Sequence, residues 1–196
     1  MKNSTIILLA FVALVLFGGV WACNKRNSFV GLRENAKAQW QQVESQYQRR
    51  SDLVPNIVAT VKGEANFEKT TLENVIAARA SATQMKVDAK DLTPEKLQQF
   101  QASQGQLSQA LGRLMVVSEN YPNLKANEAF RGLQAQLEGT ENRIKVSRND
   151  FNAAVADYNK KARSFPINLL AGAFGFKTKE GFKAEEAASK APEVKF

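Results

Sequence analysis

FRGLQAQLEGTENRIKVSRNDFNAAVADYNKKARSF, residues 130–165, is the longest run of helical periodicity in the chain. Its apolar and small side chains recur every three or four residues, with one break near residue 153: Phe130, Leu133, Leu137, Thr140, Ile144, Ser147, Phe151, Val155, Tyr158, Ala162 and Phe165. This spacing places them on one face of an α-helix of about ten turns. Because the other faces are polar, the helix must bury its apolar face against other helices.

Three earlier segments show the same periodicity. Residues 28–50 and about 55–85 each carry one apolar stripe, and a third helix begins at Pro94 behind Thr93, a residue type that caps helix N-termini. Strand-like alternation is absent from this part of the sequence. Four amphipathic helices with short connections predict an all-α fold, an antiparallel up-and-down four-helix bundle over residues 24–165.

An apolar segment precedes the bundle. Ile6–Cys23 contains no charged side chain, and as a helix it is about 27 Å long, close to the roughly 30 Å hydrocarbon core of a bilayer. Residues 1–23 are therefore expected to form a single N-terminal transmembrane helix. The excess of Lys and Arg after the segment favours a single-pass cell-membrane protein with a cytoplasmic body.

The single cysteine leaves a second interpretation of this segment. Cys23 directly follows the small residue Ala22 at the end of the apolar run, as in a bacterial lipoprotein signal. In that case Cys23 is lipidated and the protein is a lipid-anchored envelope lipoprotein with its body outside the cytoplasm. The bulky Trp21 fits such a signal poorly.

Composition restricts the chemistry. The chain has no histidine and one cysteine, which excludes histidine-based catalysis and histidine or thiolate metal sites. No phosphate-binding glycine loop is present, so no catalytic residue, metal or cofactor is predicted. Glu138, Glu141 and Arg143 leave an alternative, a ligand-binding or carboxylate-based enzyme-like bundle. An ordinary ion pair explains them equally well.

The net charge of +8 indicates affinity for anionic partners. Because the positive charges are scattered, without aromatic residues between them, nucleic acid is not an expected partner. Membrane lipid is, through an apolar then charged C-terminal tail at residues 166–196. The residues expected to contact the membrane are Ile167, Leu169, Leu170, Phe174, Phe176, Lys177 and Lys179. Docking of this tail on its own bundle is the alternative.

Four ordered segments carry a family resemblance. They are QRRSDLVPN (48–56), ENYPNLKAN (119–127), LEGTENRI (137–144) and SFPINLLAG (164–172), the last continuing to the FGF of residues 174–176. In this order, behind one N-terminal anchor, they resemble the LemA family of bacterial membrane proteins over about residues 43–196. The resemblance implies an N-terminal membrane helix and an antiparallel four-helix bundle. It implies little about activity.

The expected topology places two of these segments together. A turn near residues 50–55 and a turn at residues 121–122 would both lie at the end of the bundle far from the membrane. A non-enzymatic scaffold or adaptor that binds an unidentified protein partner there is the function this predicts. The candidate partner-binding residues are Arg49, Arg50, Asp52, Asn56, Asn120, Tyr121 and Asn127. Helix capping alone accounts for the Asp and Asn residues but not for the two arginines.

Overall fold

The chain is all-helical, as its periodicity predicts. A computed structural model describes residues 2–64, 67–89, 92–173 and 175–183; helix makes up 84% of the structure, and these residues include no strand. The helices are α1 (Lys2–Lys62), α2 (Lys69–Gln84), α3 (Pro94–Ser118), α4 (Pro122–Ala126), α5 (Glu128–Arg163) and α6 (Ile167–Ala173).

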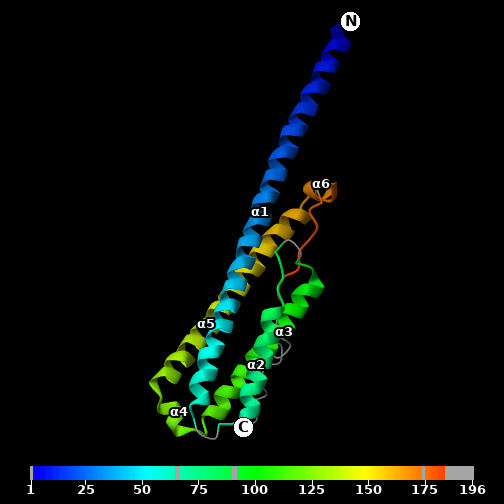
Figure 1. The fold of residues 1–196 in the computed structure, drawn as a ribbon. Helices are drawn as coiled ribbons and strands as arrows, with labels where there is room; N and C mark the ends of the chain where they lie inside the picture. Colours follow the sequence, from blue (N-terminus) through cyan, green and yellow to red (C-terminus); the bar gives the residue numbers. More distant parts are fainter. Residues whose placement is uncertain (1, 65–66, 90–91, 174, 184–196) are drawn as a thin grey trace, which may run out of the picture.

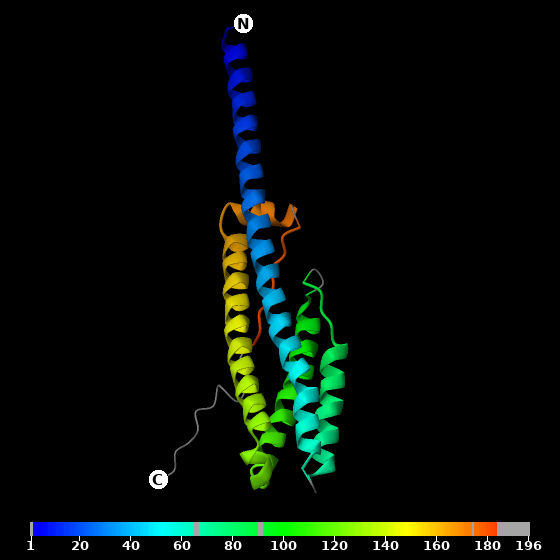
Figure 2. The same ribbon diagram turned by 60° about the vertical axis from the view of Figure 1, so that its left-hand side comes forward.

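The helices pack as two pairs, one of which contains the long helix α1. α1 and α5 lie side by side, and α2 packs along α3 next to the C-terminal part of α1 (Figures 1 and 2). The short α4 lies at one end of this body, called the distal end below. α6 lies at the other end, the proximal end, where the first turns of α1 extend beyond the rest of the molecule.

The interior of the distal half is aliphatic. Every helix from α1 to α5 contributes to it, and Phe130 is the only aromatic residue among its buried members. The buried members of this distal core are Leu53, Val54, Ile57, Val58, Val61, Leu72, Val75, Ala82, Leu107, Leu111, Leu114, Leu124, Phe130 and Leu137.

The proximal half is filled by aromatic rings. Trp40 is fully buried, and its ring centroid lies 5.3 Å from that of Phe100 and 5.4 Å from that of Phe151. Nearer the proximal end, Phe29 stacks on Phe176 with centroids 4.6 Å apart. The proximal core comprises Trp40, Val43, Tyr47, Val87, Leu97, Phe100, Ile144, Phe151, Val155 and Phe182, and beyond them Phe29, Tyr158, Ala162, Ile167 and Phe176.

The expected break in the first helix is wrong. α1 continues through residues 50–55 and includes Pro55 in its interior. A proline there has no N–H to donate to the carbonyl four residues earlier, which normally weakens the helix. The Nε of Arg79 on α2 instead donates to the Ser51 carbonyl oxygen at 2.9 Å. A hydrogen bond from a neighbouring helix therefore replaces the one that Pro55 removes.

The helix starts follow the local sequence more closely. The Thr93 side chain accepts a hydrogen bond from the Lys96 amide, with Pro94 at the first helical position, so the cap predicted there is confirmed. Asn127 caps α5 by accepting from the amides of Ala129 and Phe130. Thr140 and Ser147, the polar members of the α5 stripe, return their hydroxyl hydrogen bonds to carbonyls of their own helix.

Candidate functional site

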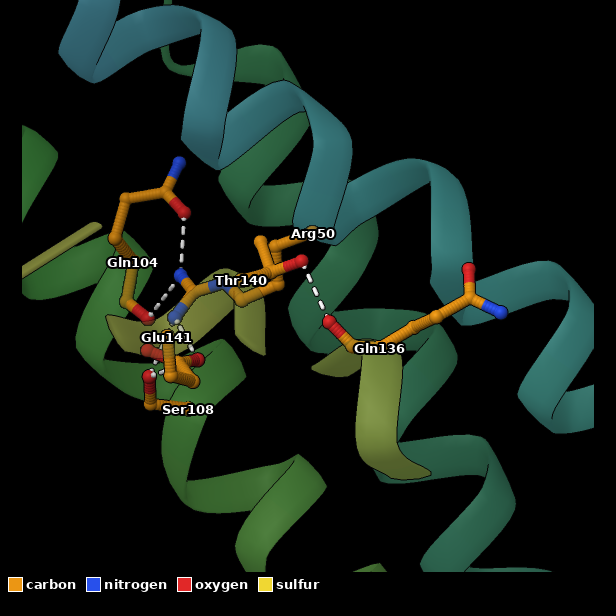
Figure 3. Close-up of polar contacts among 6 residues, drawn as sticks. All are labelled: Arg50, Gln104, Ser108, Gln136, Thr140 and Glu141. Atoms are coloured by element: carbon orange, nitrogen blue, oxygen red, sulfur yellow. Dashed lines mark hydrogen bonds and ion pairs between the residues drawn. The ribbon is translucent and has the colours of Figure 1, made fainter. Parts of the chain in front are cut away.

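A buried arginine separates the two cores. Arg50 on α1 is 1% exposed and lies in the sequence between Tyr47 of the proximal core and Leu53 of the distal core. Figure 3 shows its contacts with Gln104, Ser108 and Glu141. Its Nη2 donates to the side-chain Oε1 of Gln104 at 2.7 Å and to the Gln104 carbonyl at 3.0 Å. Its Nη1 donates to Ser108 Oγ at 2.5 Å and to Glu141 Oε1 at 2.7 Å. One guanidinium thus joins α1, α3 and α5.

Charge and hydrogen bonding compensate most of the cost of burying this cation. Glu141 supplies the opposite charge, and its side chain remains 41% exposed, so the ion pair reaches solvent on one side. The guanidinium carbon lies 5.0 Å from the Tyr47 ring centroid, a cation–π distance. Arg50 Nε and the neighbouring Ser51 Oγ are buried without a hydrogen-bond partner. The two terminal nitrogens of Arg50 therefore have hydrogen-bond partners, whereas its buried Nε has none.

The structure shows where the residues of the alternative carboxylate-based site, Glu138, Glu141 and Arg143, lie. Glu141 pairs with Arg50 across helices, whereas Arg143 is exposed. Glu138 is also exposed and accepts a hydrogen bond from Gln134 one turn earlier on α5. The three residues Glu138, Glu141 and Arg143 do not converge on a shared cavity. Among the residues that the structure describes, no three His, Cys, Asp or Glu side chains are grouped to hold a metal ion.

The candidate partner-binding residues do not share one turn. Arg49, Asp52 and Asn56 are exposed on the continuous helix α1, not in the expected turn. Arg50 is buried, so the expectation that it lies on an exposed tip is wrong. Asn120, Tyr121 and Asn127 do lie at the distal end, beside α4. Asn127 uses its side chain as the α5 cap, and the half-buried Tyr121 ring packs against Phe67 with centroids 4.9 Å apart.

Residues 175–183 form an extended strap along α5. Asn152 and Asn159 lie two turns apart on α5, and each forms hydrogen bonds with the backbone of one strap residue. Asn152 accepts from the Phe182 amide at 2.8 Å and donates to its carbonyl at 3.1 Å; Asn159 does the same with Lys179 at 2.9 and 2.7 Å. A Cβ on Gly181 would stand 2.5 Å from Asn152 Oδ1, so this position admits only glycine without rearrangement.

The strap changes the expected membrane contact. Ile167 and Phe176 are buried against Phe29, so the prediction that they face lipid is wrong. Leu169 is 70% exposed and Lys177 is exposed. Lys179 is half-buried, with its Nζ 5.8 Å from the centroid of the Tyr158 ring. The Leu170 side chain and Phe174 lie outside the described residues.

The strap closes one side of a cavity of about 280 Å³. Arg33, Glu34 and Lys37 border it from α1, Lys179 borders it from the strap, and its apolar lining is Ala36, Trp40, Ala89, Leu92 and Phe151. Burial, and then the positive charge of Arg33, lower the pKa of Lys179. Burial raises the pKa of Tyr158, with Arg33 opposing that shift. Glu34 faces both Arg33 and Lys37, at 3.4 and 3.8 Å.

The first turns of α1 extend beyond the other parts of the chain that the structure describes. The side chains of Phe17 and Leu14 are 77% and 71% exposed, and the segment is apolar enough to cross a membrane. Signal sequences pass the same test of length and composition. Trp21 and Lys25 lie at the end of the segment, with the Lys25 Nζ 5.8 Å from the indole centroid, and Cys23 is free and exposed.

Sequence spacing already contained a signal for Arg50. Trp40, Val43, Tyr47, Arg50, Val54, Ile57 and Val61 step by three and four without interruption, which places Arg50 on the buried face. Reading Pro55 as a helix start concealed this continuity. Nothing local in the sequence marks Asn152 and Asn159 as the residues that hold the strap, because their partners are 20 and 30 residues away.

Together these features define a membrane-associated, all-helical protein with an apolar N-terminal helix. A family model described as "LemA family" matches residues 39–196. The chain belongs to the LemA family.

Its relatives include magnetosome proteins. Magnetosome protein MamQ 2 of Paramagnetospirillum magneticum is 28% identical over 95% of this chain and 72% of its own length. Magnetosome protein MamQ of Magnetospirillum gryphiswaldense is 27% identical over 94% of this chain and 71% of its own. Protein LemA of Metamycoplasma hominis is 24% identical over 66% of this chain and 55% of its own length.

Proposed function

We propose that the protein is a non-enzymatic scaffold or adaptor of the bacterial envelope, with an antiparallel four-helix bundle held at the membrane by α1. The observation that carries this proposal is the continuity of α1. The same unbroken helix supplies the apolar segment and one wall of both cores. From Asn24 to Lys62 it covers about 58 Å at 1.5 Å per residue. The body is thereby held at a fixed height and presents its distal end away from the bilayer.

The chemistry of the interior supports a binding role over catalysis. The buried charged group, Arg50, is enclosed by its own helices, with 1% of its surface exposed. Enzymes expose a reactive group in a cleft that a substrate can enter. The names of the relatives, magnetosome protein and Protein LemA, are not those of enzymes. An assembly role at a membrane is consistent with both observations.

The surface proposed for the protein partner has two parts, the exposed side chains Arg49, Asp52 and Asn56 along α1 and the residues Asn120, Tyr121 and Asn127 at the distal end; together they are called the distal surface. The first three form an exposed polar stripe on α1, where Asp52 accepts a hydrogen bond from Gln48 at 2.8 Å. The body is proposed to face the cytoplasm, on the basis of the Lys and Arg residues that follow the apolar segment. Lipidation of Cys23 is the alternative, and it would place the body on the opposite side.

Site-specific photocrosslinking in intact membranes tests the proposal. A photoreactive amino acid replaces Asn56 or Asn120 on the distal surface, and the matched control replaces Asn149, an equally exposed asparagine on α5. We expect one discrete protein adduct from the two distal positions and none from position 149. Reversing the charges of Arg49 and Asp52 should reduce the adduct without changing stability. Equal crosslinking from position 149, or no adduct from either distal position, would contradict the proposal.

A further inference from the structure

Two large apolar side chains are uncovered at the proximal end of the body. Phe165, in the connection between α5 and α6, is 81% exposed, and Leu169 on α6 is 70% exposed. Ile167, between them, is 5% exposed and packs into the proximal core. α6 thus buries one side chain against the body and leaves another free. Figure 2 shows α6 crossing α1 at the point where α1 leaves the body.

The position of α6 along the axis of α1 follows from the buried cluster that Ile167 shares with Phe29. Ile167 and Phe29 belong to the same buried cluster, so α6 lies level with Phe29 on α1. Phe29 is six residues beyond the apolar segment, which is about 9 Å along the helix axis. The headgroup layer extends roughly 5–8 Å beyond the hydrocarbon core on each side. Side chains of α6 and its preceding connection therefore stand at the edge of that layer when α1 spans the membrane.

On α1 and α5 the charges between the Phe29 level and the bilayer are positive, and the nearest acidic residue, Asp157, directly precedes Tyr158, whose ring packs on Phe29. Lys25 and Arg26 follow the apolar segment on α1, and Lys160, Lys161 and Arg163 lie in the last turn of α5. No acidic residue occurs in the sequence at 24–31 or at 158–173. Each cation near an anionic membrane surface contributes about 1 kcal/mol of attraction. Exposed apolar side chains surrounded by cations are the composition of segments that lie in a lipid interface.

We propose that Phe165 and Leu169, with these five cations, form a second membrane contact that rests on the anionic lipids of the bilayer crossed by α1. This inference depends on the proposed membrane anchoring and adds a lipid-facing end to the body. It replaces the contact expected from sequence, because Ile167 and Phe176 are buried and Phe165 is the more exposed aromatic residue. Continuity with the anchor identifies the occupant, since the bilayer begins where this surface ends.

Nitroxide accessibility in full-length protein tests the contact. Cys23→Ser removes the native thiol, and a spin label is then attached at Leu169→Cys. Position 169 is 70% exposed, so the label does not disturb packing. The protein is reconstituted into vesicles of phosphatidylcholine and phosphatidylglycerol. We expect the ratio of its accessibility to oxygen over its accessibility to a water-soluble nickel chelate to be several-fold higher than at an aqueous position. A label at Val146→Cys on α5, 58% exposed, is the matched aqueous control and should favour the chelate.

Labels at other positions distinguish a failure of the membrane anchor from a failure of the second membrane contact. A label at Leu14→Cys, inside the apolar segment, must report hydrocarbon; if it reports water, the anchor itself is wrong and so is the proposed function. If position 14 reports hydrocarbon while position 169 reports water, only the second membrane contact fails. Low accessibility of position 169 to both reagents means that protein covers it, which also overturns the lipid contact. In pure phosphatidylcholine, or at high salt, the label should shift toward water, because the cations lose their partner.

Discussion

In the distal half of the body, helices α1 to α5 surround aliphatic side chains, whereas in the proximal half α1 and α5 lie beside the first turns of α3, a loop and the strap. The second arrangement buries Trp40, Phe100, Phe151 and Phe182, whose rings pack in edge-on, tilted and stacked pairs. With fewer helices to fill the interior, each position must supply more volume, and aromatic rings do so. In this protein the half that is enclosed by fewer helices has the more aromatic core.

The largest expected effect comes from removing the centre of the proximal core. Trp40→Ala deletes a fully buried indole and its 3.0 Å hydrogen bond to the Val87 carbonyl. We expect a loss of about 4 kcal/mol in the free energy of unfolding, measured by denaturant titration in detergent micelles. Hydrogen exchange should accelerate in the strap and at residues 85–89 while α2 stays protected.

A matched change in the distal core shows whether the two halves are separable. Leu111→Ala removes an aliphatic side chain that is 2% exposed, and it should accelerate exchange in α2 and α3 but not in the strap. If both variants deprotect the same amides together, the halves unfold as one unit. The distinction between them would then be one of composition only.

The next largest loss of stability is expected at Arg50, on the boundary between the distal and proximal halves. Arg50→Ala leaves Gln104, Ser108 and Glu141 without their shared donor, and we expect a loss of about 3 kcal/mol by the same titration. The half-exposed carboxylate of Glu141 can rehydrate, which limits the cost. Arg49→Ala, one residue away and exposed, should change stability by less than about 0.5 kcal/mol. Similar losses from the two arginines would contradict the buried position of Arg50.

A smaller effect tests the strap. Asn152→Ala removes two hydrogen bonds to the Phe182 backbone, and we expect about 1–2 kcal/mol of destabilisation with faster exchange of the Phe182 amide. Asn149→Ala, an exposed asparagine on the same helix, is the control and should be nearly neutral. If Asn152→Ala leaves the Phe182 amide protected, the aromatic contacts of Phe182 hold the strap without the asparagine.

The smallest effect is a pH dependence at Glu44, on the α1 surface beside the 85–89 loop. Burial raises the pKa of Glu44 above 4.5, a hydrogen bond with Trp40 opposes this, and the charge of Asp88 adds to it. Because the folded state holds the proton more tightly, this group's contribution to stability falls as pH rises from about 4.5 through the folded pKa. Glu44→Gln should therefore lose less stability than the parent protein across that interval in parallel denaturant titrations.

Local signals in the sequence identified α3 and α5 and missed the contacts between distant residues. The helix expected at about residues 55–85 is instead the end of α1 and the separate α2. The α5 stripe and the Thr93 cap depend on side chains within one or two turns, so periodicity and residue type suffice. The continuity of α1 depends on Arg79 reaching Ser51 from another helix, and local rules for proline cannot include that. The sequence predicts Arg50 in an exposed turn because Pro55 is taken as a helix start, and the partners that bury Arg50 lie 54–91 residues away.

With α1 anchored in the bilayer as proposed, its unbroken helix acts as a rigid rod that couples the tilt of the apolar segment to the position of the body. Transmembrane helices tilt by about 20° on average, and they change tilt when bilayer thickness changes. The arm outside the membrane is about 58 Å long, so such a tilt displaces the distal end sideways by roughly 20 Å. Because α1 is continuous from the apolar segment to the cores, a small change in its tilt in the bilayer displaces α4 by a large distance.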